Sequence, residues 1–153
     1  MRTPLLYAGM LAARELTNLL QGTQLGVTLC ELHDQKPEFI CSESTSMLLE
    51  LFEANTNNAE HASLVHHGTV TFTDGRKCAA IIMRAATANP EWTPFVVGLP
   101  YRAPNHSGGF AIHAPVVLST APSTAKDWLD FMFEGFETEN PSLWSEYSDN
   151  LDD

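Results

Sequence analysis

Two β-rich segments, Leu64 to Phe72 and Lys77 to Thr87, flank an Asp74-Gly75 pair near the middle of the sequence. An Asp-Gly pair between such segments is a strong signal for a β-hairpin with a type I′ turn, so the fold must contain antiparallel strands. Pairing about a two-residue turn predicts one face with Val70, Phe72, Ala79, Ile81 and Met83. It predicts an opposite face with His67, Thr69, Thr71, Cys78, Ala80 and Ile82.

The remaining sequence predicts a second hairpin, further strands and helices near both ends. Helices are expected at Thr3 to Leu20 and Ser46 to Ala54, and strands at Leu25 to Leu32, Glu38 to Glu43, Phe95 to Leu99 and Phe110 to Ser119. Pro115 lacks an amide donor and should interrupt the last of these strands. We expect an α+β fold, with a mostly antiparallel sheet of five to six strands built from two hairpins and the N- and C-terminal helices packed on it.

The second hairpin turns at Asp34 to Pro37. If Gln35-Lys36 forms its loop, Cys30 and Cys41 become opposed neighbours on adjacent strands. Two interpretations follow: a pair of small apolar residues, or a redox or metal-binding pair.

The segment from Pro122 to Phe136 predicts an amphipathic helix with an acidic stripe. At about 100° per residue, the carboxylates fall within an arc of about 80°. They belong to Asp127, Asp130, Glu134 and Glu137. The other side carries large aromatic residues, which must be buried either in the protein's own core or against a partner.

The negative charge is concentrated in the last part of the chain. The protein has 8 basic and 19 acidic residues, a net charge of −11, and residues 121–153 carry 9 of the acids with Lys126 as their one base. This charge disfavours binding to nucleic acids or anionic membranes, because both would be repelled. It would attract a basic protein surface, or it serves solubility alone.

Three cysteines without a dense disulfide pattern favour a reducing compartment, and we expect a cytoplasmic protein. No apolar run approaches the roughly 18 residues of a membrane span. We expect residues 1–140 to form a single α+β domain and residues 141–153 to form an acidic tail.

The triplet His67-Gly68-Thr69 places an imidazole and a hydroxyl on one face of a strand, where they can hold a phosphate together. With His113 on another strand, the arrangement resembles the 2H phosphoesterase superfamily, which carries two His-x-Thr/Ser elements. The resemblance implies a phosphodiesterase that works without a metal. The second element here reads His113-Ala114-Pro115, with proline in place of the hydroxyl residue.

The loop from Tyr101 to Gly109 offers a second candidate site, because it combines Tyr101, Arg102 and His106 with flexible glycines. Arg102 can meet a carboxylate or a phosphate, and Trp92 in the preceding loop can supply a stacking wall. The cysteines and histidines lack the spacing of known metal motifs, so we expect neither a metal nor a cofactor.

Two functional hypotheses follow, and the balance leans away from an enzyme. The first is a small acidic interaction or inhibitory module, of the kind found among phage or bacterial accessory proteins. It would bind a basic partner through Asp127, Asp130, Glu134 and Glu137. The second is a metal-independent phosphodiesterase or nucleotide-binding protein that uses His67, Thr69, His113 and Arg102. A homodimer is compatible with either.

Overall fold

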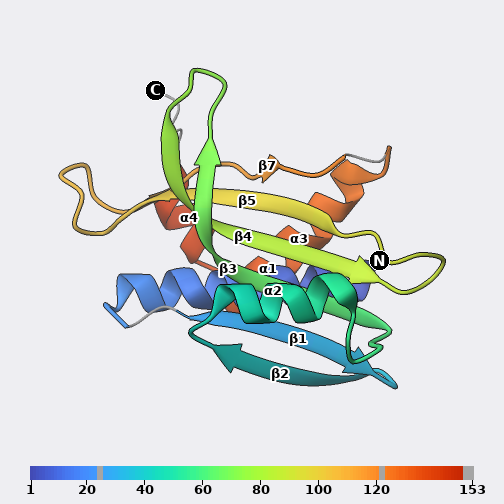
Figure 1. Cartoon of the computed structure of the whole chain (residues 1–153). Helices are drawn as coiled ribbons and strands as arrows, with labels where there is room; N and C mark the ends of the chain where they lie inside the picture. Colours follow the sequence, from blue (N-terminus) through green and yellow to red (C-terminus); the bar gives the residue numbers. More distant parts are fainter. Residues whose placement is uncertain (24–25, 121–122, 150–153) are drawn as a thin grey trace.

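The computed structural model describes residues 1–23, 26–120 and 123–149, which form an antiparallel sheet with helices on both faces (Figure 1). Its elements are α1 (Arg2–Leu20), β1 (Val27–His33), β2 (Lys36–Ser42), α2 (Thr45–Ala54), β3 (His61–Thr71), β4 (Lys77–Thr87), β5 (Phe95–Arg102), β6 (Ala111–Ile112), β7 (Val116–Val117), α3 (Ala125–Glu139) and α4 (Leu143–Tyr147). The α+β fold is confirmed. Pro122, the expected start of the acidic helix, lies outside the described residues.

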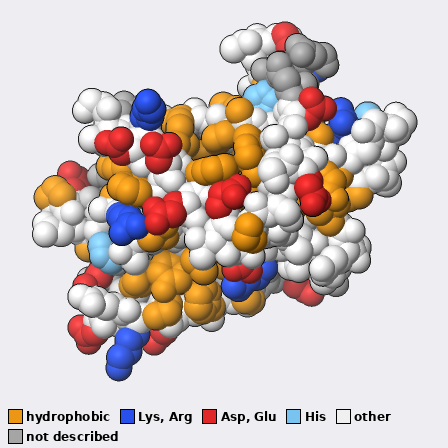
Figure 2. Space-filling view, turned by 180° about the vertical axis from the view of Figure 1, so that it is seen from behind, with side chains coloured by type: hydrophobic (Ala, Val, Ile, Leu, Met, Phe, Trp, Pro, Cys, Tyr) orange, Lys and Arg blue, Asp and Glu red, His pale blue; other side chains and the backbone are white. Residues whose placement is uncertain are grey.

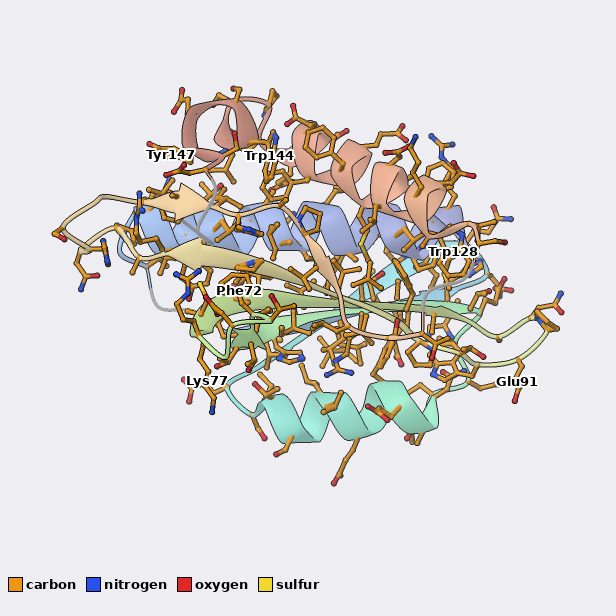
Figure 3. The ribbon with its side chains drawn as sticks, turned by 90° about the horizontal axis from the view of Figure 1, so that it is seen from above. Phe72, Lys77, Glu91, Trp128, Trp144 and Tyr147 are labelled. Atoms are coloured by element: carbon orange, nitrogen blue, oxygen red, sulfur yellow. The ribbon has the colours of Figure 1, made fainter. Side chains whose placement is uncertain are left out.

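The seven-stranded sheet has the order β2-β1-β3-β4-β5-β6, and β7 also pairs with β5. All of these named strand pairs are antiparallel. Strands β6 and β7 lie on either side of Pro115, so the predicted interruption occurs at that proline. Helix α2 covers one face of the sheet, while α1 and α3 lie on the other (Figure 3). No helix in the described ranges has the length and apolar character needed to cross a bilayer.

The β3–β4 hairpin differs from the prediction by one residue of register. The amide of Gly75 donates to the carbonyl of Phe72 at 2.9 Å, and Gly75 has φ of 90° while Asp74 keeps a negative φ. This is a type I turn followed by a left-handed glycine, which makes a three-residue loop. Thr71 therefore pairs with Lys77, and the predicted faces are wrong. The face of His67 instead carries Thr69, Thr71, Ala79, Ile81 and Met83.

The β1–β2 hairpin is the one that has a type I′ turn. Its two turn residues, Asp34 and Gln35, have φ of 51° and 64°. Cys30 then pairs with Phe39 and not with Cys41, so the predicted opposition of the two thiols is wrong. Burial raises the pKa of the Cys30 thiol to about 12, which keeps it protonated and disfavours a redox or metal-binding role.

Helices α1 and α3 pack backbone against backbone at two glycines. A Cβ atom added to Gly9 would lie 1.8 Å from the carbonyl oxygen of Met132, and one added to Gly135 would lie 2.0 Å from that of Leu6. This contact buries part of the aromatic side of α3, including Phe136. The predicted helix therefore closes much of its apolar side within its own chain.

The sheet face beneath α2 has a small core of its own. Leu48 and Phe52 of α2 pack there against Leu29 and Leu64 of the sheet. Trp92 closes one side of this core, because its Nε1 donates to the carbonyl of Phe52 at 2.9 Å and the two rings lie 5.7 Å apart. Trp92 thus has a structural contact that explains its presence in an otherwise polar loop.

The first part of the expected tail packs on the domain. Leu143 of α4 is buried, and the amide of Asp149 donates to the carbonyl of Ile112 at 2.9 Å. Residues 150–153 lie outside the described part of the chain. The acidic segment up to Asp149 is therefore held in a fixed position relative to the sheet.

Candidate functional site

The structure does not bring His67 and His113 together. Following the paired residues across β3, β4 and β5 places His67 on the face that carries Tyr101 and Ile112. His113 follows Ile112 directly and lies on the other face, where its ring is 5.2 Å from that of Phe72. One phosphate cannot reach both imidazoles through the sheet, and this geometry disfavours the two-histidine mechanism.

His67 instead belongs to a polar chain that joins three elements. Its Nδ1 lies 3.3 Å from the hydroxyl of Tyr101, and its Nε2 lies 3.6 Å from Oε2 of Glu15. Burial raises the pKa of Tyr101, so its hydroxyl keeps its proton. Thr69, on the same face, is exposed. The sequence could not predict the part played by Glu15, because the docking of α1 on β3 depends on tertiary packing.

His66, the neighbouring imidazole, is held in its neutral form. Its Nδ1 lies 2.9 Å from the carbonyl of His67, and its Nε2 accepts a hydrogen bond from Nε of Arg84 at 3.2 Å. Burial, together with the nearby Arg84 guanidinium, lowers the pKa of His66 below 6.5. A proton on Nε2 would break the bond to Arg84 and bring two cations together.

This arrangement predicts that acid lowers the free energy of unfolding. Well above pH 6.5 His66 is neutral in both states, but as the pH falls through 6.5 toward the lower folded pKa the unfolded chain takes up a proton first. Stability is therefore lost across that window. We expect urea denaturation of the His66→Gln variant to show a shallower decline in the free energy of unfolding as the pH falls below 6.5. Equal slopes for the variant and the wild-type protein would contradict the prediction.

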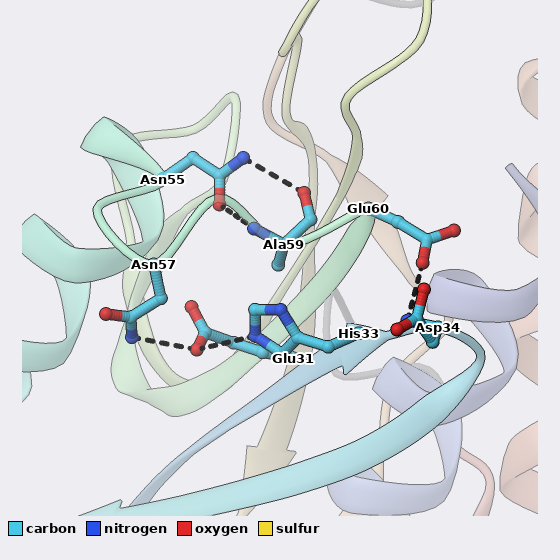
Figure 4. A network of polar contacts seen from close by, with 7 residues as sticks. All are labelled: Glu31, His33, Asp34, Asn55, Asn57, Ala59 and Glu60. Carbon is cyan, nitrogen blue, oxygen red and sulfur yellow. Dashed lines mark hydrogen bonds and ion pairs between the residues drawn. The ribbon is translucent and has the colours of Figure 1, made fainter.

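A polar network around the buried carboxylate of Glu31 ties the loop after α2 to the turn of the first hairpin (Figure 4). Glu31 is 1% exposed, and its Oε1 accepts from Nδ2 of Asn57 at 2.9 Å and lies 3.6 Å from Nε2 of His33. Oε1 of Glu60 accepts from the amide of Asp34 at 2.6 Å. These contacts fix the loop in place. Within the described ranges, no group of three or more His, Cys, Asp or Glu residues is placed to hold a metal ion.

The loop that follows β5 is held by Arg102. Its Nε donates to the carbonyl of Gly109 at 2.7 Å, and its Nη2 donates to that of Gly108 at 3.0 Å. The same guanidinium lies 3.5 Å from a carboxylate oxygen of Asp149. Nδ1 of His106 accepts from the amide of Gly108 at 2.9 Å. Arg102, which was predicted to bind a ligand, thus also stabilises the conformation of its own loop.

The structure brings together three of the four residues predicted for this second site. Tyr101, Arg102 and His106 line one hollow beside the tip of the β3–β4 hairpin, whereas Trp92 belongs to the core beneath α2. The predicted stacking wall therefore does not face the loop.

The predicted acidic stripe lies on α3 and is only partly neutralised. Glu134 pairs with Arg2 of α1 at 2.9 Å. Asp127 and Asp130 are exposed and Glu137 is half-buried, and none of these three makes an ion pair within the described part of the chain. The stripe therefore presents carboxylates that remain available to a partner.

An apolar cleft of about 60 Å³ lies between α3 and α4, above Met83 of β4 and Leu99 of β5. Phe133 and Trp144 form its rim, with ring centroids 5.8 Å apart in an edge-on arrangement, and Phe133 is 44% exposed. Figure 3 shows Trp144 reaching from α4 toward α3. On this side of the molecule apolar side chains gather between acidic ones (Figure 2). The lining includes Leu99, Leu129, Met132, Phe133, Phe136 and Trp144.

Comparison with protein-family models, with curated proteins and with solved structures finds no match to this chain. Function is therefore inferred from geometry. Of the surfaces described, the cleft beside α3 combines exposed aromatic area with unpaired charge, and we take it as the candidate site.

Proposed function

We propose that this protein binds a basic segment of a partner protein and accepts one apolar side chain of that segment into the cleft between α3 and α4. The observation that carries the proposal is the exposed ring of Phe133 at the rim of an apolar cleft, beside carboxylates that form no ion pair with any residue described in the structure. The occupant expected is therefore a short segment with an apolar anchor and Lys or Arg on either side of it.

The spacing along α3 supports this combination. Asp130 lies three residues before Phe133 and Glu137 lies four residues after it, so both project from the same side of the helix as the ring. A cation placed before or after the anchor would meet one of these carboxylates. Glu134, in the same acidic stripe, does not compete for this cation, because it is already paired with Arg2.

The two parts of the site have different energetic roles. Burying a large apolar side chain stabilises a complex by about 1.5–3 kcal/mol, so the cleft would supply most of the affinity. Exposed carboxylates contribute little net affinity, but they accelerate association and select basic partners. Binding should therefore weaken with added salt without being abolished.

Selection from a displayed random peptide library tests the proposal. We expect the enriched peptides to combine Lys or Arg with a Val or Leu anchor, whose size suits the cleft. Their affinity should fall at least about ten-fold for Phe133→Ala, which corresponds to about 1.4 kcal/mol. The matched control is Phe39→Ala, because Phe39 is also half exposed (49%) but lies on β2, far from the cleft.

A second pair of variants tests the contribution of the α3 carboxylates to binding. Asp130→Asn combined with Glu137→Gln should weaken binding several-fold at low salt and less at high salt. Glu43→Gln combined with Glu50→Gln makes the same change of charge away from α3 and should have no effect. Enriched peptides without basic residues, or binding insensitive to Phe133→Ala, would refute the proposal. A concentration-dependent dimer that Phe133→Ala dissolves would also refute it, because a second copy would then occupy the cleft.

A further inference from the structure

A basic hollow lies on another part of this acidic protein, between the tip of the β3–β4 hairpin and the loop after β5. Its volume is about 410 Å³, and it is lined by Arg76, Lys77 and Arg102 together with Cys78, Tyr101 and His106. Three of the chain's eight Lys and Arg residues thus meet at one site. Figure 3 shows Lys77 at the hairpin end, well away from Trp144 and the α3–α4 cleft.

The cations in this hollow are only partly neutralised. Nε of Arg76 lies 2.7 Å from a carboxylate oxygen of Asp74, and Nη2 of Arg102 lies 3.5 Å from one of Asp149. Lys77 is exposed and takes part in no ion pair among the contacts that the structure describes. Among the described residues, two carboxylates pair with these cations, and the Lys77 ammonium is left available within a protein of net charge −11.

Two further donors have fixed directions. Nδ1 of His106 accepts from the amide of Gly108, so the neutral ring carries its proton on Nε2 and can donate from there. The guanidinium of Arg102 is oriented by the carbonyls of Gly108 and Gly109, which fixes its plane before any ligand arrives. Pre-positioned donors of this kind suit the oxygens of a phosphate.

We propose that this hollow binds the phosphate group of a small anionic ligand, and that Asp149 occupies part of the anion's place when the ligand is absent. The carboxylate of Asp149 is 56% exposed and contacts Arg102 at 3.5 Å, so it forms a weak pair that a doubly charged phosphate can displace. The chain segment that carries it is seated by the hydrogen bond from the Asp149 amide to Ile112. The ligand is a small molecule and not a polynucleotide, because the surrounding negative charge repels a long phosphate backbone.

Titration of the ¹⁵N-labelled full chain with inorganic phosphate and with pyrophosphate tests this proposal, and citrate serves as the carboxylate source. We expect saturable shifts of the amides around Lys77 and Arg102 with both phosphate probes, and a weaker response to citrate. Lys77→Gln should weaken phosphate binding about five-fold, the effect of losing one charge-assisted contact. Lys36→Gln removes the same charge at the turn of the first hairpin and should leave binding unchanged.

Substitution of Asp149 should have the opposite effect on phosphate affinity. Asp149→Asn removes the competing charge with little change in shape, and it should tighten phosphate binding about three-fold. Asp127→Asn on α3 makes the same change elsewhere and should not. Non-saturable shifts, tighter binding of citrate than of phosphate, or equal effects of Lys77→Gln and Lys36→Gln would overturn the proposal. These variants leave the α3–α4 cleft intact, so the result is independent of peptide binding there.

Discussion

Replacing Gly9 with alanine is expected to lower the free energy of unfolding by about 2–3 kcal/mol, through the overpacking of two helices. The new Cβ atom would lie 1.8 Å from the carbonyl oxygen of Met132 and 2.9 Å from the amide nitrogen of Phe136. Both are backbone atoms of α3, so no side-chain rotation can relieve the contact. Urea denaturation followed by circular dichroism measures the change.

The sign of the change in unfolding free energy distinguishes a packed glycine from an exposed one. At an exposed helix position, alanine in place of glycine stabilises a helix by about 1 kcal/mol. Gly135→Ala should destabilise like Gly9→Ala, because its Cβ atom would lie 2.0 Å from the carbonyl oxygen of Leu6. Gly26→Ala is the control with room for a methyl group, since its nearest contact is 3.6 Å away, and it should change stability little. Stabilisation by both helical variants would mean that α1 and α3 are not in contact.

Replacing Phe52 with alanine is expected to cost about 3–5 kcal/mol, the largest loss that we predict. Phe52 is 1% exposed and fills the core beneath α2, where it supports the ring of Trp92. The cavity cannot collapse easily, because the sheet beneath it also carries the core under α1. Chemical denaturation gives the total loss, and hydrogen–deuterium exchange should show faster exchange in residues 45–54 than in α1.

Met47→Ala provides the matched control within the same helix. Met47 is 49% exposed, so its truncation should change stability by less than about 0.5 kcal/mol. A loss below about 1 kcal/mol for Phe52→Ala would show that α2 does not rest on a core of its own. Equal exchange rates in α1 and α2 of the variant would instead indicate that the two sides of the sheet unfold as one unit.

Local patterns predicted the class of fold and the positions of most elements. Alternating β-rich segments placed β3 and β4, and Pro115 marked the interruption between β6 and β7. The amphipathic pattern after Thr124 placed α3 and separated its acidic stripe from its aromatic side. These features depend on residues close together in the sequence, which is why a single sequence suffices for them.

Register could not be predicted, because it depends on backbone angles within each turn. Asp74-Gly75 favours a type I′ turn by composition, yet only the glycine takes a positive φ there, while Asp34-Gln35 takes positive φ at both positions. A shift of one residue moved every side chain of β4 relative to His67. The proximity of Glu15 to His67 was equally hidden, because it arises from the docking of a helix on a strand.

The contact between α1 and α3 can form only late in protein synthesis. Arg2 and Glu134 form their ion pair across 132 residues of sequence, and Gly9 meets α3 in the same interface. During translation, α1 and all of the named strands are made before α3. Helix α1 therefore stays without its final neighbour until residue 139 has been made, and closing this loop late slows the completion of the fold. The nascent chain exposes an apolar face of α1 throughout that interval. A chaperone could bind this face until α3 covers it.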